Sequence, residues 1–305
     1  MTDQKLAVGI CTYKRPEKLK KCLSSLLVAK TPNDISTCII IADNDPNGSA
    51  KSIVDIHKGN SILPIHYSII TQQGIPFARN HILRQADSLD ITELAFIDDD
   101  EYVSTEWLIK LWHFYNTSDA DVAYGQVITV YPKNTPQWIY EGKFYQRPSH
   151  PTGTQLLSAA TNNVLFDFNK IVRQLGIYFD ESFGLRGGSD TDFFVRARHN
   201  GAVIKFVNDA IVSEPLDKKR FTLRYFLRRS FRKKNHVSRY KHYDYRQKIV
   251  FVTVSAYYIT RGLLTVLCMG LFNRGIFYKG LMFLAYGAGS VCSIFGIQIK
   301  WDEYC

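Results

Sequence analysis

The chain has 305 residues, of which 46% are hydrophobic, so it fits one large or two modest domains with a sizeable core, which excludes a largely disordered protein. Six cysteines without a CxxC pair exclude a disulfide scaffold and a cysteine-rich zinc site, and they favour reduced thiols in the cytosol. The net charge of +10 is concentrated in Lys218–Lys248, which carries +12 against −2 for the remainder, and this argues against a generally basic nucleic-acid binder.

The first half of the chain reads as alternating strands and helices. Residues Met1–Lys5 lack a basic region followed by a long apolar run, so we expect no secretory signal. Short apolar runs predict four strands: Leu6–Cys11, Thr37–Ala42, Ile65–Ile70 and Leu94–Ile97. Apolar residues at helical spacing predict helices that start at Pro16 and cover Ser49–Lys58, Ile75–Asp87 and Thr105–Asn116. Apolar strands separated by helices are typical of a parallel α/β sheet.

The second half continues this pattern and then changes character after Pro215. We predict a strand over Val122–Val130 and a proline-rich connection over Tyr131–Gln155. Two helices follow over Asn169–Leu175 and Thr191–Asn200, and then a further strand over Val203–Val207. We therefore divide the chain into a first domain, residues 1–215, and a basic, apolar helical region, residues 216–305.

Two apolar stretches follow the basic segment. Ile249–Phe272 has 24 residues and contains Arg261, and Gly280–Ile297 has 18 residues with four glycines. Twelve Ile, Leu, Val and Phe at roughly −0.3 to −0.6 kcal/mol each outweigh one central Arg at about +3 kcal/mol, so the first could enter a bilayer. The alternative is a soluble helical subdomain. The preceding basic run favours attachment to an anionic membrane on its cytoplasmic side. If both stretches cross, Asn273–Lys279 lies outside and Trp301–Cys305 inside.

The most informative motif is the apolar strand Leu94–Ile97 followed by four acids, Asp98-Asp99-Asp100-Glu101. The carboxyl ends of parallel strands are where α/β sheets bind ligands, and adjacent carboxylates repel one another unless a cation lies between them. Oxygen ligands alone select a hard ion, Mg²⁺ or Mn²⁺. The alternative is an acidic helix N-terminus favoured by the helix dipole.

Asp43 ends the second predicted strand at the same edge of the sheet. An acid there commonly accepts hydrogen bonds from a nucleotide, whereas the turn-forming residues of Asp43–Gly48 favour an Asx turn instead. Thr12, Tyr13 and Arg15, after the first strand, would line the same edge.

A third acidic motif is Gly187-Gly188-Ser189-Asp190-Thr191-Asp192. Asp190 precedes a predicted helix, so it would either cap that helix or act as a general base held near a loop. No GxGxxG, P-loop or GxSxG motif is present, which disfavours dinucleotide oxidoreductases, P-loop enzymes and α/β-hydrolases.

Five motifs in this order make the sequence resemble the inverting family 2 glycosyltransferases of the GT-A fold, and among them the bacterial exopolysaccharide enzymes of the succinoglycan type. The motifs are Val8–Pro16, Ala42–Asp45, Gly74–Asn80, Phe96–Glu101 and Gly188–Asp190, and the resemblance covers about residues 5–215. The fold it implies is a GT-A nucleotide-sugar-binding domain with a mostly parallel sheet, followed by the helical region.

The resemblance implies a nucleotide-sugar donor, expected to be a UDP-sugar, and a saccharide or lipid-linked acceptor. Asp190 matches the family's catalytic base, although the family often has Glu-Asp where this chain has Ser189-Asp190. Asp98 and Asp100 match the DxD motif that binds Mg²⁺ or Mn²⁺. The implied donor-binding residues are Thr12, Tyr13, Arg15, Asp43, Arg79, Asp98 and Asp99. Candidate acceptor contacts are Asn162, Asn163 and Asp192, with Thr161 beside them.

The sequence leaves two other function classes open. A metal-dependent phosphotransferase also uses an acidic strand end, although its nucleophilic Asp would usually follow the first strand, where this chain has Cys11-Thr12-Tyr13. A non-catalytic protein that binds anionic lipid or nucleic acid would explain Lys218–Lys248 and leave the acidic motifs without a role. We favour the glycosyltransferase, acting in cell-surface polysaccharide synthesis at the cytoplasmic face of the bacterial inner membrane, with no nucleic-acid partner.

The proline-rich connection carries three aromatic residues, Trp138, Tyr140 and Tyr145. They would stack on sugar rings or pack inside the protein.

Overall fold

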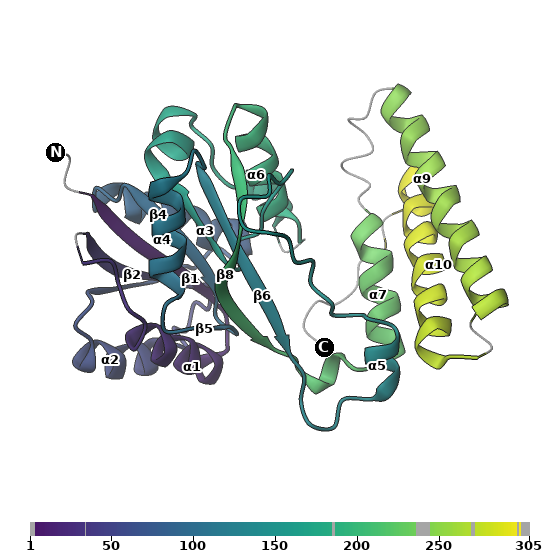
Figure 1. Cartoon of the computed structure of the whole chain (residues 1–305), viewed down its shortest axis with the longest axis horizontal. Helices are drawn as coiled ribbons and strands as arrows, with labels where there is room; N and C mark the ends of the chain where they lie inside the picture. Colours follow the sequence, from purple (N-terminus) through teal and green to yellow (C-terminus); the bar gives the residue numbers. More distant parts are fainter. Residues whose placement is uncertain are drawn as a thin grey trace. The chain divides into compact units, whose positions relative to one another are not determined.

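The computed structural model describes residues 4–33, 35–184, 187–235, 245–269, 272–297 and 299. Contacts divide the chain into two units (Figure 1). Unit 1 comprises Met1–Val130 and Arg147–Pro215, and unit 2 comprises Tyr131–Gln146 and Leu216–Cys305. The boundary after Pro215 coincides with the predicted one, whereas Tyr131–Gln146, which we had assigned to the first domain, belongs to unit 2.

Unit 1 is built on one eight-stranded sheet with the order β3-β2-β1-β4-β7-β6-β8-β5. The strands are β1 (Lys5–Thr12), β2 (Ser36–Asp43), β3 (Ile65–Ile69), β4 (Glu93–Asp98), β5 (Tyr102–Val103), β6 (Val122–Val130), β7 (Val164–Asp167) and β8 (Ile204–Pro215). The pairs β1–β2, β1–β4, β2–β3 and β6–β8 are parallel, whereas β7 is antiparallel to β4 and β6, and β5 is antiparallel to β8. The predicted α/β class with a mostly parallel sheet is therefore confirmed.

Helices cover both faces of this sheet (Figure 1). On one face lie α1 (Pro16–Leu27), α2 (Lys51–Asn60) and α4 (Trp107–Thr117), and on the other α3 (Ile75–Ser88) and α6 (Ser189–His199). The alternation of β1 explains the two cores, because Leu6, Val8 and Ile10 face the first set of helices and Ala7 faces the second. The predicted helix at Asn169–Leu175 is a π-helical turn over Asn169–Gln174, followed by a 3₁₀ turn at Glu181–Phe183.

Unit 2 consists of helices. They are α5 (Gln137–Glu141), α7 (Leu223–Lys234), α9 (Tyr245–Leu264) and α10 (Arg274–Ile294), with a 3₁₀ turn at Lys218–Arg220 and a π-helical turn at Thr265–Met269 that extends α9. The predicted apolar stretches are thus helical up to Met269 in the first and up to Ile294 in the second, and α5 forms inside the connection that we predicted as loop-rich. The proposed position of Trp301–Cys305 lies outside the described residues.

The aromatic residues of the connection pack within unit 2. The ring of Trp138 lies 5.7 Å from that of Phe226 and 5.0 Å from that of Tyr278, and the ring of Tyr145 lies 5.3 Å from that of Phe226. Trp138 and Tyr145 are therefore packing residues in this structure. Tyr140 is more exposed and its ring lies beside Tyr131.

Candidate active site

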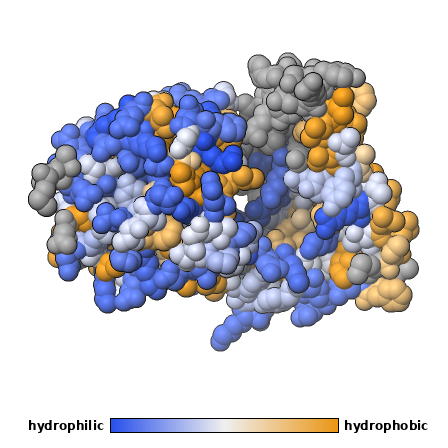
Figure 2. All heavy atoms as spheres, turned by 45° about the horizontal axis from the view of Figure 1, so that its top comes forward, coloured by the Kyte–Doolittle hydropathy of each residue, from blue (hydrophilic) through white to orange (hydrophobic). Residues whose placement is uncertain are grey.

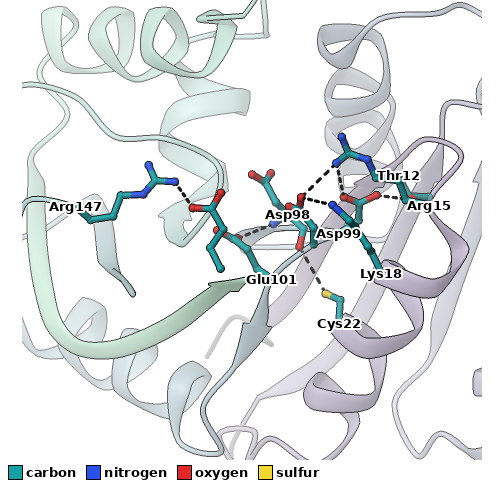
Figure 3. A network of polar contacts seen from close by, with 10 residues as sticks. Thr12, Arg15, Lys18, Cys22, Asp98, Asp99, Glu101 and Arg147 are labelled. Atoms are coloured by element: carbon teal, nitrogen blue, oxygen red, sulfur yellow. Dashed lines mark hydrogen bonds and ion pairs between the residues drawn. The ribbon is translucent and has the colours of Figure 1, made fainter. Parts of the chain in front are cut away.

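The acidic motif forms a tight turn directly after β4. The backbone N–H of Glu101 donates to the carbonyl of Asp98 (3.2 Å), and the Glu101 carboxylate accepts from the backbone N–H of Asp98 (3.1 Å). Glu101 therefore closes the turn with both its backbone and its side chain (Figure 3). In the sheet register Cys11 pairs with Asp98, and Thr12 pairs with Asp43. The polar residues at the ends of β1, β2 and β4 therefore meet at one edge of the sheet.

Side chains from the end of β1 and the start of α1 hold the next two acids. The Thr12 hydroxyl donates to Asp99 Oδ2 (2.8 Å), and Arg15 Nη1 lies 3.4 Å from Asp99 and 3.5 Å from Asp100. Lys18 Nζ lies 3.1 Å from Asp100 Oδ2 (Figure 3). The sequence analysis missed Lys18, although its place one helical turn after Arg15 is a spacing that puts two side chains on the same face.

The turn concentrates negative charge in a buried environment. Burial raises the pKa of Asp98 to about 7, and the nearby carboxylates of Asp100, Asp99 and Asp190 add to this shift, while the Arg79 guanidinium opposes it. Burial and the nearby Asp100 carboxylate likewise raise the pKa of Asp99 to about 6, although the Arg15 guanidinium lowers it. Burial also holds the pKa of Glu101 well above its usual range. The turn thus favours a bound cation, because a cation would stabilise the charged carboxylates.

Arg79 connects this turn with the third acidic motif. Its guanidinium is buried, lies over the Phe179 ring at 5.4 Å, and donates through Nη1 to the Ser189 hydroxyl (3.0 Å). Arg79 lowers the pKa of Asp98 and Asp190 raises it, so both charges act on the same carboxylate. Arg79 and Asp190 therefore belong to one site with Asp98, although β4 and α6 are far apart in the sequence.

Asp190 lies in the first turn of α6 and does not cap it. The helix begins at Ser189 after Gly188, which has a φ of 101° that favours glycine, and Asp190 Oδ1 accepts from the N–H of Thr191 (2.8 Å). Our alternative prediction of an N-cap at Asp190 is therefore wrong, because the helix starts at Ser189 and its N-cap position is occupied by Gly188. Asp192 pairs instead with Arg196 (2.9 Å), one turn along α6.

The two predicted asparagines have different environments. Asn162 accepts from the Tyr124 hydroxyl (3.2 Å) and donates to Glu101 (3.4 Å), so it lies beside the acidic turn. Asn163 is fully buried: it accepts from Trp107 Nε1 (2.7 Å) and donates to the carbonyls of Gln126 and Ala210 (2.9 Å each). Asn163 thus serves the packing of the sheet. The neighbouring Thr161 hydroxyl is buried without a hydrogen-bond partner.

Asp43 is also fully buried. Its carboxylate accepts from the N–H groups of Asp45 (3.0 Å) and Ala50 (2.9 Å) and from the Tyr67 hydroxyl (2.8 Å), which is the Asx turn that the sequence offered as an alternative. Its contact with a nucleotide base stays a prediction. Tyr13 is half-exposed, with the Lys14 ammonium 5.3 Å from its ring centre.

Arg147 and Glu214 were not found by the sequence analysis. They form an ion pair beside Glu101, and the Glu214 charge contributes to the raised pKa of Glu101 (Figure 3). The two residues are 67 positions apart and carry no motif, so the pair becomes visible only when the chain folds.

The residues present fit a divalent cation that phosphate groups of a bound substrate would help to hold. Among the residues that the structure describes, no three His, Cys, Asp or Glu side chains form a complete metal cage. Magnesium sites of nucleotide enzymes usually need only one or two carboxylates together with substrate phosphates, and the donor set here contains oxygen alone. Asp98 and Asp100 meet this requirement.

Asn80, in the same motif as Arg79, holds the segment that precedes α6. Its Nδ2 donates to the Phe179 carbonyl (2.9 Å) and to Glu181 (3.0 Å), and its Oδ1 accepts from the Phe179 N–H (2.8 Å). We predict that Asn80→Ala lowers the free energy of unfolding by about 2–4 kcal/mol, because both buried backbone groups of Phe179 lose their partner. Urea unfolding measures this.

The matched control is Asn60→Ala, which removes an exposed hydrogen bond within α2 and should change the free energy of unfolding by less than about 0.5 kcal/mol. Equal effects of the two substitutions would mean that Asn80 does not hold this segment.

Comparison with known proteins agrees with this geometry. Residues 7–175 match the model of the family described as Glycosyl transferase family 2. Over 225 residues the chain is 34% identical to the succinoglycan biosynthesis protein ExoM of Rhizobium meliloti (strain 1021), which covers 74% of this chain and 71% of that protein. A poly(ribitol-phosphate) beta-glucosyltransferase of Bacillus spizizenii (strain ATCC 23059 / NRRL B-14472 / W23) is 19% identical over 137 residues, 45% of this chain and 21% of that protein.

Solved structures extend the likeness to most of the chain. S. aureus TarS 1-349 in complex with UDP has a TM-score of 0.55 at 16% identity and covers 98% of this chain and 94% of its own. GalNAc-T7 with UDP, GalNAc and Mn2+ has a TM-score of 0.55 at 13% identity and covers 77% and 50%. At these identities the matches show a shared fold.

Proposed function

Because the chain belongs to glycosyl transferase family 2 and is therefore a glycosyltransferase, we propose that it transfers a sugar from a UDP-sugar to a hydroxyl of a saccharide or lipid-linked acceptor, with inversion at the anomeric carbon. The observation that carries this proposal is the meeting of the Asp98–Glu101 turn, Arg79 and Asp190 at one edge of the sheet. The names of the curated relatives support a role in cell-surface polysaccharide synthesis.

Family membership decides among the three function classes that the sequence left open. A phosphotransferase would need a nucleophilic carboxylate, and at the end of β1 the chain has Cys11 instead, whose pKa burial raises to about 12. A purely binding protein would leave the buried carboxylates and the Arg79 guanidinium without a use, although burying charges costs free energy.

The donor is bound by residues at the ends of β1 and β4 and on α3. Thr12, Arg15 and Lys18 hold Asp99 and Asp100, and Arg79 supplies a buried positive charge, which suits an anionic diphosphate. Tyr13 lies in the loop between β1 and α1 that also carries Arg15, and Asp43 shapes the turn that borders this loop. Asn162 is the better acceptor candidate of the two asparagines, because Asn163 is fully buried.

Asp98 and Asp100 would hold Mg²⁺ or Mn²⁺, which when bound neutralises charge that develops on the leaving nucleotide. Asp190 takes the proton from the acceptor hydroxyl, since a protonated hydroxyl is a poor nucleophile. Asp190 lies in the first turn of α6, and its charge, like that of Arg79, acts on the carboxylate of Asp98. This position supports the role of a base.

Unit 2 would attach the enzyme to the cytoplasmic face of the inner membrane. One described helix, Ile249–Cys268, is long and apolar enough to cross a bilayer, with a mean hydropathy of 1.5 and only 11% of the segment buried. The core helix of a soluble protein would be mostly buried, so this exposure favours contact with lipid. The basic residues of Lys218–Lys248 would bind anionic lipid.

A screen of nucleotide sugars with and without Mn²⁺ tests the proposed reaction. We expect one UDP-sugar to bind more tightly with Mn²⁺ and its sugar to appear on the acceptor with inverted anomeric configuration by NMR. Retention of configuration would exclude Asp190 as a base for direct displacement, and binding of no nucleotide sugar would overturn the donor assignment.

A further inference from the structure

Helix α10 is the central helix of unit 2, and glycines bring its neighbours very close. A Cβ atom at Gly280 or Gly287 would lie 2.7 Å from Val266 or 2.5 Å from Ile259, both on the α9 side. One at Gly289 would lie 2.2 Å from the backbone of Phe231 in α7, and one at Gly275 would lie 2.5 Å from Glu141 in α5. Helix α10 is therefore covered by α9 on one side and by α5 and α7 elsewhere.

Polar side chains from these other segments hold both ends of α10. The Glu141 carboxylate accepts from the N–H of Gly275 (3.3 Å) at the start of the helix. After its end, Asn235 donates to the carbonyl of Ile297 (2.8 Å) and accepts from the N–H of Ile299 (3.1 Å). Helix α7, which ends just before Asn235, therefore runs alongside α10.

Charge excludes this group of helices from the hydrocarbon of a bilayer. Half of the twelve residues of α7 are Arg or Lys: Arg224, Arg228, Arg229, Arg232, Lys233 and Lys234. If α9 and α10 crossed the bilayer as a hairpin, α7 would have to enter with them. Each Arg or Lys at the centre of a bilayer costs more than several Leu or Val give back.

Helix α9 has an apolar face that no described residue covers. Its packed side carries small residues, Ser255 and Gly262, both buried. Its outer side carries Val250, Leu264 and Leu267, which are 60%, 57% and 67% exposed, together with the exposed Arg261 one helical turn before Leu264. This is the reverse of a helix in a soluble core. Figure 2 shows apolar residues on the surface of unit 2, at the right of the view.

The charges that flank α9 suit a helix with both ends on one side of a membrane. Arg246 and Lys248 stand at its start in the sequence, and Arg274 and Lys279 follow it, with no acid between Phe272 and Lys279. A crossing hairpin would place the second pair outside, against the preference of Lys and Arg for the cytoplasmic side. Arg261 itself donates to the Tyr257 hydroxyl (2.9 Å) and lies over the Phe283 ring at 4.5 Å.

We infer that α9 lies in the plane of the membrane surface, with its outer face in the boundary between headgroups and acyl chains, and that α9 and α10 do not cross the bilayer. This rests on the membrane association proposed above, and it replaces the crossing hairpin that the sequence left open. The occupant of the outer face of α9 is lipid, because flanking Lys and Arg residues attract anionic headgroups.

Two thiols on the intact chain distinguish the arrangements. Cys268 is exposed in the turn that extends α9, and Arg274→Cys adds a thiol at the start of α10. The protein is added to preformed vesicles of phosphatidylcholine and phosphatidylglycerol, with Cys305→Ser as background, and a membrane-impermeant maleimide is added outside. A third thiol, from Lys51→Cys on α2, is the control for reaction in unit 1.

We expect the vesicles to protect Cys268 and to leave the thiol from Arg274→Cys as reactive as that from Lys51→Cys. Protection of both Cys268 and the thiol from Arg274→Cys until detergent is added would overturn the in-plane arrangement in favour of the hairpin. Full reaction of both, with no protein on the vesicles, would overturn the membrane association itself. Neither result bears on sugar transfer, which is measured separately with a soluble acceptor.

Leu267→Glu tests the face directly. It should weaken binding to these vesicles by about tenfold or more, because a leucine that enters the boundary is lost and a charge is gained. Ile62→Glu, at a residue that is 93% exposed in unit 1, is the matched control and should bind as the parent does. Equal binding by all three proteins would contradict the assignment of α9.

Discussion

Replacing Asp190 by Asn should lower turnover by about 10²–10⁴-fold, which is the usual contribution of a general base, and leave donor affinity nearly unchanged. The amide cannot take the proton from the acceptor hydroxyl. It can still accept the hydrogen bond from the N–H of Thr191, and α6 starts after Gly188 without help from this side chain. The thermal midpoint should therefore stay close to that of the parent.

Asp192→Asn is the matched control, two residues along the same helix. It removes an ion pair with Arg196 that is partly exposed, and such pairs contribute about 0–1 kcal/mol to stability. We expect turnover to remain within about threefold of the parent, because the Asp192 carboxylate pairs with Arg196 on the same helix. If Asp192→Asn abolishes turnover while Asp190→Asn keeps half of it, the base is Asp192. Parallel loss of donor binding and turnover in Asp190→Asn would make Asp190 a binding residue.

Removal of divalent cations by a chelator should abolish turnover, and Mn²⁺ should restore it. The carboxylates of Asp98 and Asp99 have raised pKa values because they are buried among other acids, so a cation at the turn relieves unfavourable charge. Asp100→Ala should weaken donor binding by about tenfold or more in Mn²⁺, where the carboxylate, metal and phosphates act together. Without Mn²⁺ the loss should be less than about fivefold, since only ion pairs with Lys18 and Arg15 are removed.

Asp55→Ala is the control for the loss of a Lys–Asp pair, because Asp55 pairs with Lys51 on the exposed surface of α2. Its donor affinity, measured by calorimetry, should equal that of the parent with or without Mn²⁺. Full activity of the parent in excess chelator would remove the metal from the mechanism.

The sequence predicted β1 to β4 and α1 to α4 well, because each is specified by a local pattern. Leu6–Cys11 is apolar throughout, and Leu19, Cys22, Leu23 and Leu26 recur at helical spacing, so burial on one or both faces can be read directly. Strands β5 and β7 were missed. They have two and four residues, and they exist because β8, β4 and β6 offer hydrogen-bonding edges to them.

The acidic turn was predictable and its surroundings were not. Four consecutive acids after an apolar run are visible in any sequence, and parallel strands place them at the ligand-binding edge. The contacts that define the site join residues far apart in the chain: Arg79 with Ser189, and Asn162 with Glu101. Ser189 stands where the family often has an acid, and only the structure shows that its hydroxyl still accepts from Arg79.

The sequence alone determined that the last third of the chain is basic and apolar, since charge and hydropathy are sums over residues. Only the tertiary structure decided how these features are arranged. Glycines of α10 bring α7 and α9 against two sides of it, so the cations of α7 and the apolar face of α9 belong to one packed unit. Hydropathy treats each stretch separately, whereas the free energy of entering a bilayer depends on everything that must enter with it.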